Sequence, residues 1–99
     1  MEASLADQPG DEFLRYALAM QCIHDGDVEV GRLGLLALIA DNPDSIAAYQ
    51  QLGQSYAESD EADEAREILA RGIRRARALG DHHAASEMEA IHEGLEGIG

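Results

Sequence analysis

The feature that most constrains the fold is a self-similarity between two consecutive segments of equal length, residues 12–45 and residues 46–79. When the two segments are aligned, positions that hold small or bulky apolar side chains coincide. The coinciding pairs are Leu18 with Leu52, Ala19 with Gly53, Cys22 with Tyr56, Gly31 with Ala65, Leu35 with Leu69 and Ile39 with Ile73. This periodicity predicts two copies of one structural unit, each of which buries an apolar face against its neighbour.

Turn residues divide the chain into five predicted helices, at about residues 11–23, 27–40, 45–58, 60–78 and 81–95. Short polar side chains that can accept hydrogen bonds from free backbone N–H groups stand at each predicted start. These expected N-terminal caps are Asp11, Asp27, Asp44 or Ser45, Asp60 and Asp81. Gly80 fits a C-terminal cap. No segment shows a strand pattern, and the short loops force neighbouring helices to pack antiparallel.

The fourth predicted helix shows the clearest periodicity. Its small and apolar residues recur at helical spacing and therefore form one stripe, which a core would cover. The stripe consists of Ala65, Ile68, Leu69, Gly72, Ile73 and Ala76. We interpret the arginines near the end of this helix as a solvated face that balances nearby acids, in preference to an anion site. They are Arg71, Arg74, Arg75 and Arg77.

A helix–turn–helix period of about 34 residues is the signature of tetratricopeptide repeats, and the second unit resembles that family closely. It matches the family pattern of aromatic, Leu, Gly, Tyr, Ala, bulky and small residues through Tyr49, Leu52, Gly53, Tyr56, Ala65, Leu69 and Gly72. The first unit matches through Leu18, Ala19, Gly26, Gly31, Leu35, Leu38 and Pro43. It departs at Arg15, where an aromatic residue is usual, and at Cys22, where Tyr is usual.

The resemblance implies an all-α fold of five helices, in which antiparallel helical hairpins stack as a short right-handed α-solenoid. The expected organisation is a disordered tail over residues 1–10 and a single domain over residues 11–99. Within the domain we expect repeats at residues 12–45 and 46–79 and a capping helix at residues 81–96. In such a stack, small residues let neighbouring helices approach closely, and Tyr and Leu residues fill the space between them.

Proteins that resemble this family hold peptides or partner proteins on the inner surface, which the first helix of each repeat lines. The residues that map to this surface are Phe13, Tyr16, Met20, His24, Gln50, Gln54, Met88 and His92. The set contains no Lys or Arg, so it does not favour a ligand that is clamped by its carboxylate. We expect a protein-binding or peptide-binding adaptor or scaffold whose ligand is apolar or forms hydrogen bonds with amides.

The first predicted hairpin is unusually apolar for the end of a stack. Leu14, Leu18 and Cys22 can serve the core of the hairpin. The apolar residues left over form one stripe: Phe13, Tyr16 and Met20. Either the last helix or a compact core covers this stripe, or the stripe is an exposed surface for a partner or for a weak homodimer. Homodimerisation through this hairpin is the alternative function that the sequence suggests.

The charge of the chain excludes several classes of partner. Twenty acidic residues against seven basic residues give a net charge of −13, which disfavours nucleic acid and anionic membrane surfaces. All seven bases are Arg, and the chain contains no Lys. This halophile-like composition is typical of a cytoplasm that holds molar salt, where screening weakens self-repulsion. The alternative is an acidic protein with a GC-rich coding bias.

No catalytic, metal-binding or cofactor-binding site is predicted. Adjacent histidines such as His82 and His83 point in different directions on a helix and chelate poorly. The serines have no recognisable nucleophile motif, so we do not expect an enzyme. Cys22 is the single cysteine and lies in an apolar run, which fits a reducing cytoplasm. The first ten residues do not resemble a signal peptide, and no stretch approaches the ~20 apolar residues of a membrane span.

Overall fold

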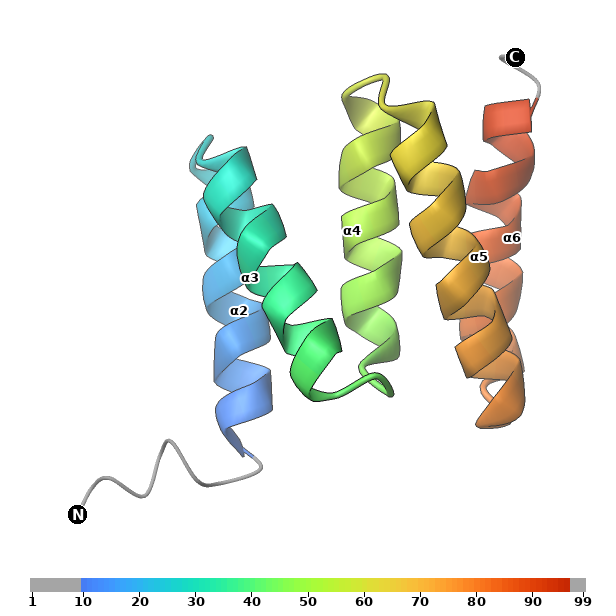
Figure 1. Ribbon diagram of the computed structural model, residues 1–99, viewed down its shortest axis with the longest axis horizontal. Helices are drawn as coiled ribbons and strands as arrows, with labels where there is room; N and C mark the ends of the chain where they lie inside the picture. The colour runs from blue at the N-terminus through green and yellow to red at the C-terminus, as the bar shows by residue number, and fades with distance from the viewer. Residues whose placement is uncertain (1–9, 97–99) are drawn as a thin grey trace.

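The computed structural model describes residues 10–96, which form five α-helices and no strand within that range (Figure 1). The helices are α2 (Gly10–His24), α3 (Val28–Asp41), α4 (Ile46–Glu58), α5 (Ala62–Ala78) and α6 (His82–Glu96). The predicted all-α architecture is confirmed. The predicted tail lies outside the described residues except for Gly10, which begins α2. Asp11 therefore lies inside this helix and is not its cap.

The helices stand side by side in chain order along the long axis of the molecule, and successive helices run in opposite directions (Figure 1). α2 packs against α3, and α4 packs against α5, so the chain forms two consecutive hairpins. α3 and α4 join the two hairpins, and α6 packs against α5 and α4 at the far end. None of the five described helices is both long and apolar enough to cross a membrane.

Three turns use the same left-handed geometry, at Gly26 (φ 96°), Asp60 (φ 62°) and Gly80 (φ 82°). In each turn, the next residue donates its N–H to the carbonyl oxygen five residues before it, at 2.8–2.9 Å, which closes the preceding helix. Asp60 was predicted to cap α5, but Glu61 occupies that position. Asp60 instead ends α4, because Asp tolerates positive φ better than most residues. In the alignment of the two repeats Asp60 corresponds to Gly26, so both hairpins turn at equivalent positions.

The other expected caps are only partly formed. The carboxylate of Asp81 accepts a hydrogen bond from the N–H of Ala84 at 3.2 Å, as a cap should. Asp27 and Ser45 precede α3 and α4, but neither side chain bonds to the helix that follows it. The Ser45 hydroxyl donates instead to the carboxylate of Glu12 at 2.5 Å, which ties the start of α4 to the start of α2.

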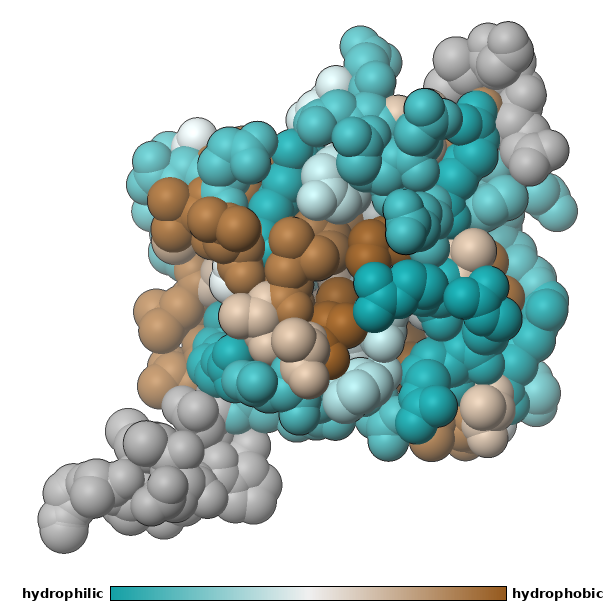
Figure 2. Space-filling model, viewed as in Figure 1, coloured by the Kyte–Doolittle hydropathy of each residue, from teal (hydrophilic) through white to brown (hydrophobic). Residues whose placement is uncertain are grey.

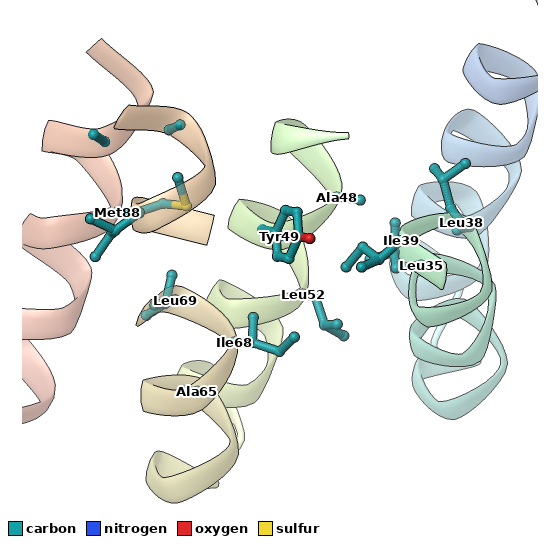
Figure 3. Packing of buried hydrophobic residues seen from close by; sticks show 14 of the residues in the cluster. Leu35, Leu38, Ile39, Ala48, Tyr49, Leu52, Ala65, Ile68, Leu69 and Met88 are labelled. Carbon is teal, nitrogen blue, oxygen red and sulfur yellow. The ribbon is translucent and has the colours of Figure 1, made fainter. Parts of the chain in front are cut away.

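The buried core lies between α3, α4, α5 and α6 (Figure 3). All six residues of the stripe predicted on α5 are buried, and Ala65 and Leu69 are completely so. In Figure 3, Leu35 and Ile39 of α3 point toward α4, where Tyr49 lies. Among the described residues of α2, Ala19 alone belongs to the fully buried apolar set, so the first helix lies at the margin of the core.

Small residues stand where helices come closest. A Cβ atom on Gly53 of α4 would lie 2.5 Å from Cδ2 of Leu69 on α5. A Cβ atom on Gly31 of α3 would lie 2.6 Å from the carbonyl oxygen of Ala19 on α2. Both distances are far shorter than ordinary van der Waals contact, so glycine at these positions sets the separation of the helices in each hairpin.

Leu18 was expected to pack in the core of the first hairpin, but it does not. Its side chain is 58% exposed, whereas Leu52, the equivalent residue of the second hairpin, is completely buried. Leu52 is buried because α3 covers that face of α4. No described helix covers the equivalent face of α2. Leu14 is also exposed, and Cys22 is half-buried.

Candidate functional site

Two hollows follow one another along α2, on the side where α2 faces α4. The first has a volume of about 510 Å³ and a mostly apolar lining. It is lined by Glu12, Phe13, Tyr16, Leu38, Asp44, Ser45, Ile46 and Ala47. The second has a volume of about 350 Å³ and a more polar lining. It is lined by Met20, Ile23, His24, Gln51, Gln54, Ser55 and Glu58.

The aromatic side chains of the first hollow are held differently. Phe13 is 75% exposed, so its ring is available to a ligand. Tyr16 is half-buried and packs against the core. Burial raises the pKa of the Tyr16 hydroxyl, and a hydrogen bond with Gln51 of α4 opposes that shift. Tyr16 therefore stays neutral at physiological pH, and its hydrogen bond links the first hollow to Gln51, which lines the second.

Carboxylates at the rim of the first hollow are fixed by hydrogen bonds. Glu12 accepts hydrogen bonds from the Asn42 amide and the Ser45 hydroxyl. Asp44 accepts a hydrogen bond from Nε of Arg75 on α5 at 2.6 Å. These hydrogen bonds hold both acids at the opening, where Arg75 partly offsets the charge of Asp44.

The second hollow has an apolar base and polar sides. Met20 and Ile23 of α2 pack against the core, while the imidazole of His24 is exposed. On α4, the Gln54 amide donates a hydrogen bond to the Glu58 carboxylate at 3.2 Å. Among the described residues that line the two hollows there is no arginine, so neither hollow offers a cation to a carboxylate ligand.

The structure brings together most of the residues predicted for the inner surface. The residues that line the two hollows are Phe13, Tyr16, Met20, His24 and Gln54. Gln50 lies on the other side of α4, where it is half-buried and donates a hydrogen bond to Glu87 of α6 at 3.1 Å. The hollows are therefore formed mainly by α2 and α4, with Leu38 of α3 and the residues just before α4, and α6 does not line them.

Met88 and His92 do not lie on this surface. Met88 is completely buried, and its sulfur would lie 2.7 Å from a Cβ atom added to Gly72 of α5. His92 is half-buried in a third hollow, together with Arg74 and Arg77 of α5. The physical reason is helical spacing, because residues four apart share a face and that face of α6 is turned toward α5.

Arg32 has a role that the sequence pattern did not indicate. This side chain lies on α3 and is only 3% exposed. Its guanidinium donates to the Ser55 hydroxyl at 3.0 Å, the Ser55 carbonyl at 2.9 Å, the Ser59 hydroxyl at 2.9 Å and Glu61 at 2.8 Å. It also lies over the ring of Tyr56, 4.5 Å from the ring centroid. Arg32 thus joins α3 to α4 and to the turn that precedes α5. Its signal in the sequence was that Arg32 is the single basic residue of the apolar helix α3.

The histidines do not form a metal-binding cluster. Among residues 10–96, no group of three His, Cys, Asp or Glu side chains is arranged to hold a metal ion. His83 lies 3.1 Å from the carboxylate of Glu87, one helical turn away on α6. It forms a surface pair on the exposed face of α6.

Solved structures of a tetratricopeptide repeat domain protein from Salinibacter ruber are similar to this chain. The solution NMR structure has a TM-score of 0.86 and 30% sequence identity, and the match covers 93% of each chain. The crystal structure has a TM-score of 0.81 and 30% identity, and the match covers 89% of this chain and 99% of the other. This chain belongs to the tetratricopeptide repeat family. No protein-family model matches the sequence, and no curated protein matches it.

Membership of the tetratricopeptide repeat family identifies the type of the two hairpins. The α2–α3 and α4–α5 hairpins are tetratricopeptide-type helical pairs, and α6 packs against the second of them. The fold is, in general, that of a non-catalytic module for protein interaction.

Proposed function

We propose that this tetratricopeptide repeat domain is an adaptor or scaffold that holds a peptide, or a segment of a partner protein, between α2 and α4. The observation that carries the proposal is the succession of a mostly apolar hollow and a more polar hollow along α2. A ligand that crosses both can place an apolar side chain beside Phe13 and a hydrogen-bonding group beside Gln54. Apolar anchors flanked by polar contacts are the usual basis of specific recognition.

The charges around the hollows define the ligand further. Glu12, Asp44 and Glu58 are carboxylates, of which Asp44 is paired with Arg75, and the described lining residues include no arginine or lysine. The net charge of the chain is −13, so an acidic ligand is repelled at long range as well. We therefore expect a neutral or basic segment with at least one apolar anchor.

The test uses a peptide selected from a random library against the immobilised domain. Replacing Phe13 by serine is expected to weaken binding of that peptide at least tenfold, since an anchor of this type contributes more than about 1.4 kcal/mol. Phe13 is largely exposed, so the substitution leaves the core intact, whereas Tyr16 is packed against it. Isothermal titration gives the affinity, and circular dichroism checks the helicity.

Leu79→Ser is the matched control, because Leu79 is also an exposed apolar residue and lies at the end of α5. It should leave the affinity unchanged. Equal affinities for wild type and Phe13→Ser would remove the first hollow as the ligand site. Equal losses in both variants would show that the peptide recognises exposed apolar residues in general.

We also propose that the acidic, lysine-free surface is adapted to a cytoplasm with high salt, where the single free Cys22 would stay reduced. The thermal midpoint of unfolding is expected to rise between low and molar KCl, because screening reduces the repulsion within a chain of charge −13. A thermal melt at low protein concentration measures this rise. Sucrose is the control, because it stabilises by exclusion from the surface without screening charge. A flat response to KCl, or an equal response to sucrose, would contradict the proposal.

A further inference from the structure

Four aliphatic side chains gather at the N-terminal end of the stack, on the outside of the first hairpin. They are Leu14 (41% exposed) and Leu18 (58%) on α2, and Val30 (60%) and Leu33 (65%) on α3. We call these residues the end patch. Figure 2 shows apolar surface gathered over this end of the molecule, while much of the rest of that view is hydrophilic.

The second hairpin shows how the fold treats the positions of the patch on α2. In the repeat alignment, Ala48 and Leu52 of α4 correspond to Leu14 and Leu18, and both are completely buried. They are buried because α4 packs against α3 as well as α5. α4 is the helix of the second repeat that is equivalent to α2. The face that another helix covers on α4 is therefore exposed on α2.

The two residues of the patch on α3 differ from their counterparts on α5 in chemical type. Glu64 and Glu67 of α5 correspond to Val30 and Leu33 in the same alignment, and both are exposed. The fold therefore leaves these positions in contact with water, and the second hairpin fills them with charged residues. Aliphatic residues at the same positions of the first hairpin indicate a surface that another surface covers.

The end patch combines projecting aliphatic side chains with a hollow. Beside the projecting side chains lies a hollow of about 250 Å³ with a mostly apolar lining. Leu18 and Val30 form its sides, and Ala19 and Gly34 lie between them. A two-fold interface needs projections and hollows on the same face, since each residue meets the partner's version of the same surface.

Charge restricts where a second copy can bind. Each chain carries a charge of −13, so two copies can approach only where carboxylates are sparse. The patch is aliphatic, and the arginine beside it, Arg15, is paired with Asp41 at 2.8 Å. A basic partner would gain more from the acidic parts of the surface than from this one.

We propose that the end patches of two copies pack together in a symmetric homodimer, with the α2–α3 hairpin of each chain at the interface. The Cα atoms span 33 by 17 Å across the stack, so one end face is somewhat smaller than the ~800 Å² per partner of a standard stable interface. The dimer is therefore weak, and it strengthens with salt as the repulsion between the chains is screened. This surface is separate from the two hollows, so dimerisation does not depend on the proposed peptide site.

Light scattering on a concentration series in molar KCl tests the dimer. Wild type is expected to reach twice the chain mass at high micromolar concentration, and Leu18→Glu/Leu33→Glu is expected to remain at the chain mass with unchanged helicity. Leu79→Glu, which adds a negative charge at an exposed leucine outside the patch, should still dimerise. Phe13→Ser should dimerise as well, which separates this result from the test of the peptide site.

A second measurement needs no substitution. Cys22 is the single cysteine and lines the hollow beside the patch, so a bulky maleimide on Cys22 is expected to convert the wild type to a monomer. Wild type that stays monomeric at high micromolar concentration in molar KCl would overturn the proposal. A dimer that persists after alkylation, or in the Leu18→Glu/Leu33→Glu variant, would overturn it too.

Discussion

Replacing Arg32 by methionine is expected to lower the free energy of unfolding by about 2 to 3 kcal/mol, roughly a quarter or more of the stability of a small domain. Arg32 donates four hydrogen bonds to Ser55, Ser59 and Glu61, and its guanidinium covers the ring of Tyr56. Methionine fills part of the volume, but it leaves the buried Ser55 hydroxyl and carbonyl without their donor. The effect stays near the lower end for a broken buried ion pair, because the Glu61 side chain is 38% exposed and can be rehydrated.

Arg66→Met provides the control for this experiment. Arg66 forms an ion pair with Asp63 at 2.8 Å, but its side chain is 33% exposed and that of Asp63 is 96% exposed. Its removal should cost no more than about 0.5 kcal/mol, as is usual for exposed pairs one turn apart. Urea titrations of the two variants and wild type measure the difference. Equal losses would mean that Arg32 acts as a surface charge and does not clamp the two hairpins together.

Replacing Gly31 by alanine is expected to lower the free energy of unfolding by about 2 kcal/mol, although alanine is the better helix former. The new Cβ would lie 2.6 Å from the carbonyl oxygen of Ala19 and 2.5 Å from Cγ1 of Ile23. The Ile23 side chain can turn away, but the oxygen belongs to the backbone of α2, so the two helices must separate. Apolar contacts along the whole hairpin would be weakened as a result.

Gly94→Ala on α6 is the matched control, because a Cβ there meets no atom within 4 Å. It should stabilise the protein by up to about 1 kcal/mol, through helix propensity alone. Thermal melts followed by circular dichroism compare the two glycine variants with wild type. A stabilising effect at both positions would show that α2 and α3 do not approach as closely as the structure indicates.

The sequence by itself was enough to predict the helices and the regular spacing of small and apolar residues along them. The small residues at Gly31, Gly53 and Ala65 indicated close helix contacts, and the stripe on α5 indicated its buried face. These features were predictable because helical periodicity and turn chemistry act over a few residues, within reach of a local reading of the chain. Capping was the local feature that the sequence predicted less well: Asp60 was expected to cap α5 but ends α4, since the same residue type can cap one helix or end another.

The candidate site was only partly predictable from the sequence. The pattern placed Phe13, Tyr16 and Met20 on one face of α2, and the structure adds that this face meets α4. The sequence could not show that Met88 points into the core, because the rotation of α6 about its axis depends on how it packs against α5. Nor could it show the contacts of Arg32 with the second hairpin, whose residues lie more than twenty positions away along the chain.

The exposure of Leu14 and Leu18 was likewise decided by tertiary structure alone. In sequence they are equivalent to Ala48 and Leu52, which are buried, and nothing local distinguishes the two pairs. Burial depends on which helix lies across each face, and α3 covers α4 while no described helix covers that side of α2. Periodicity thus determined which residues share a face, whereas the arrangement of neighbouring helices decided which of those faces became core and which became surface.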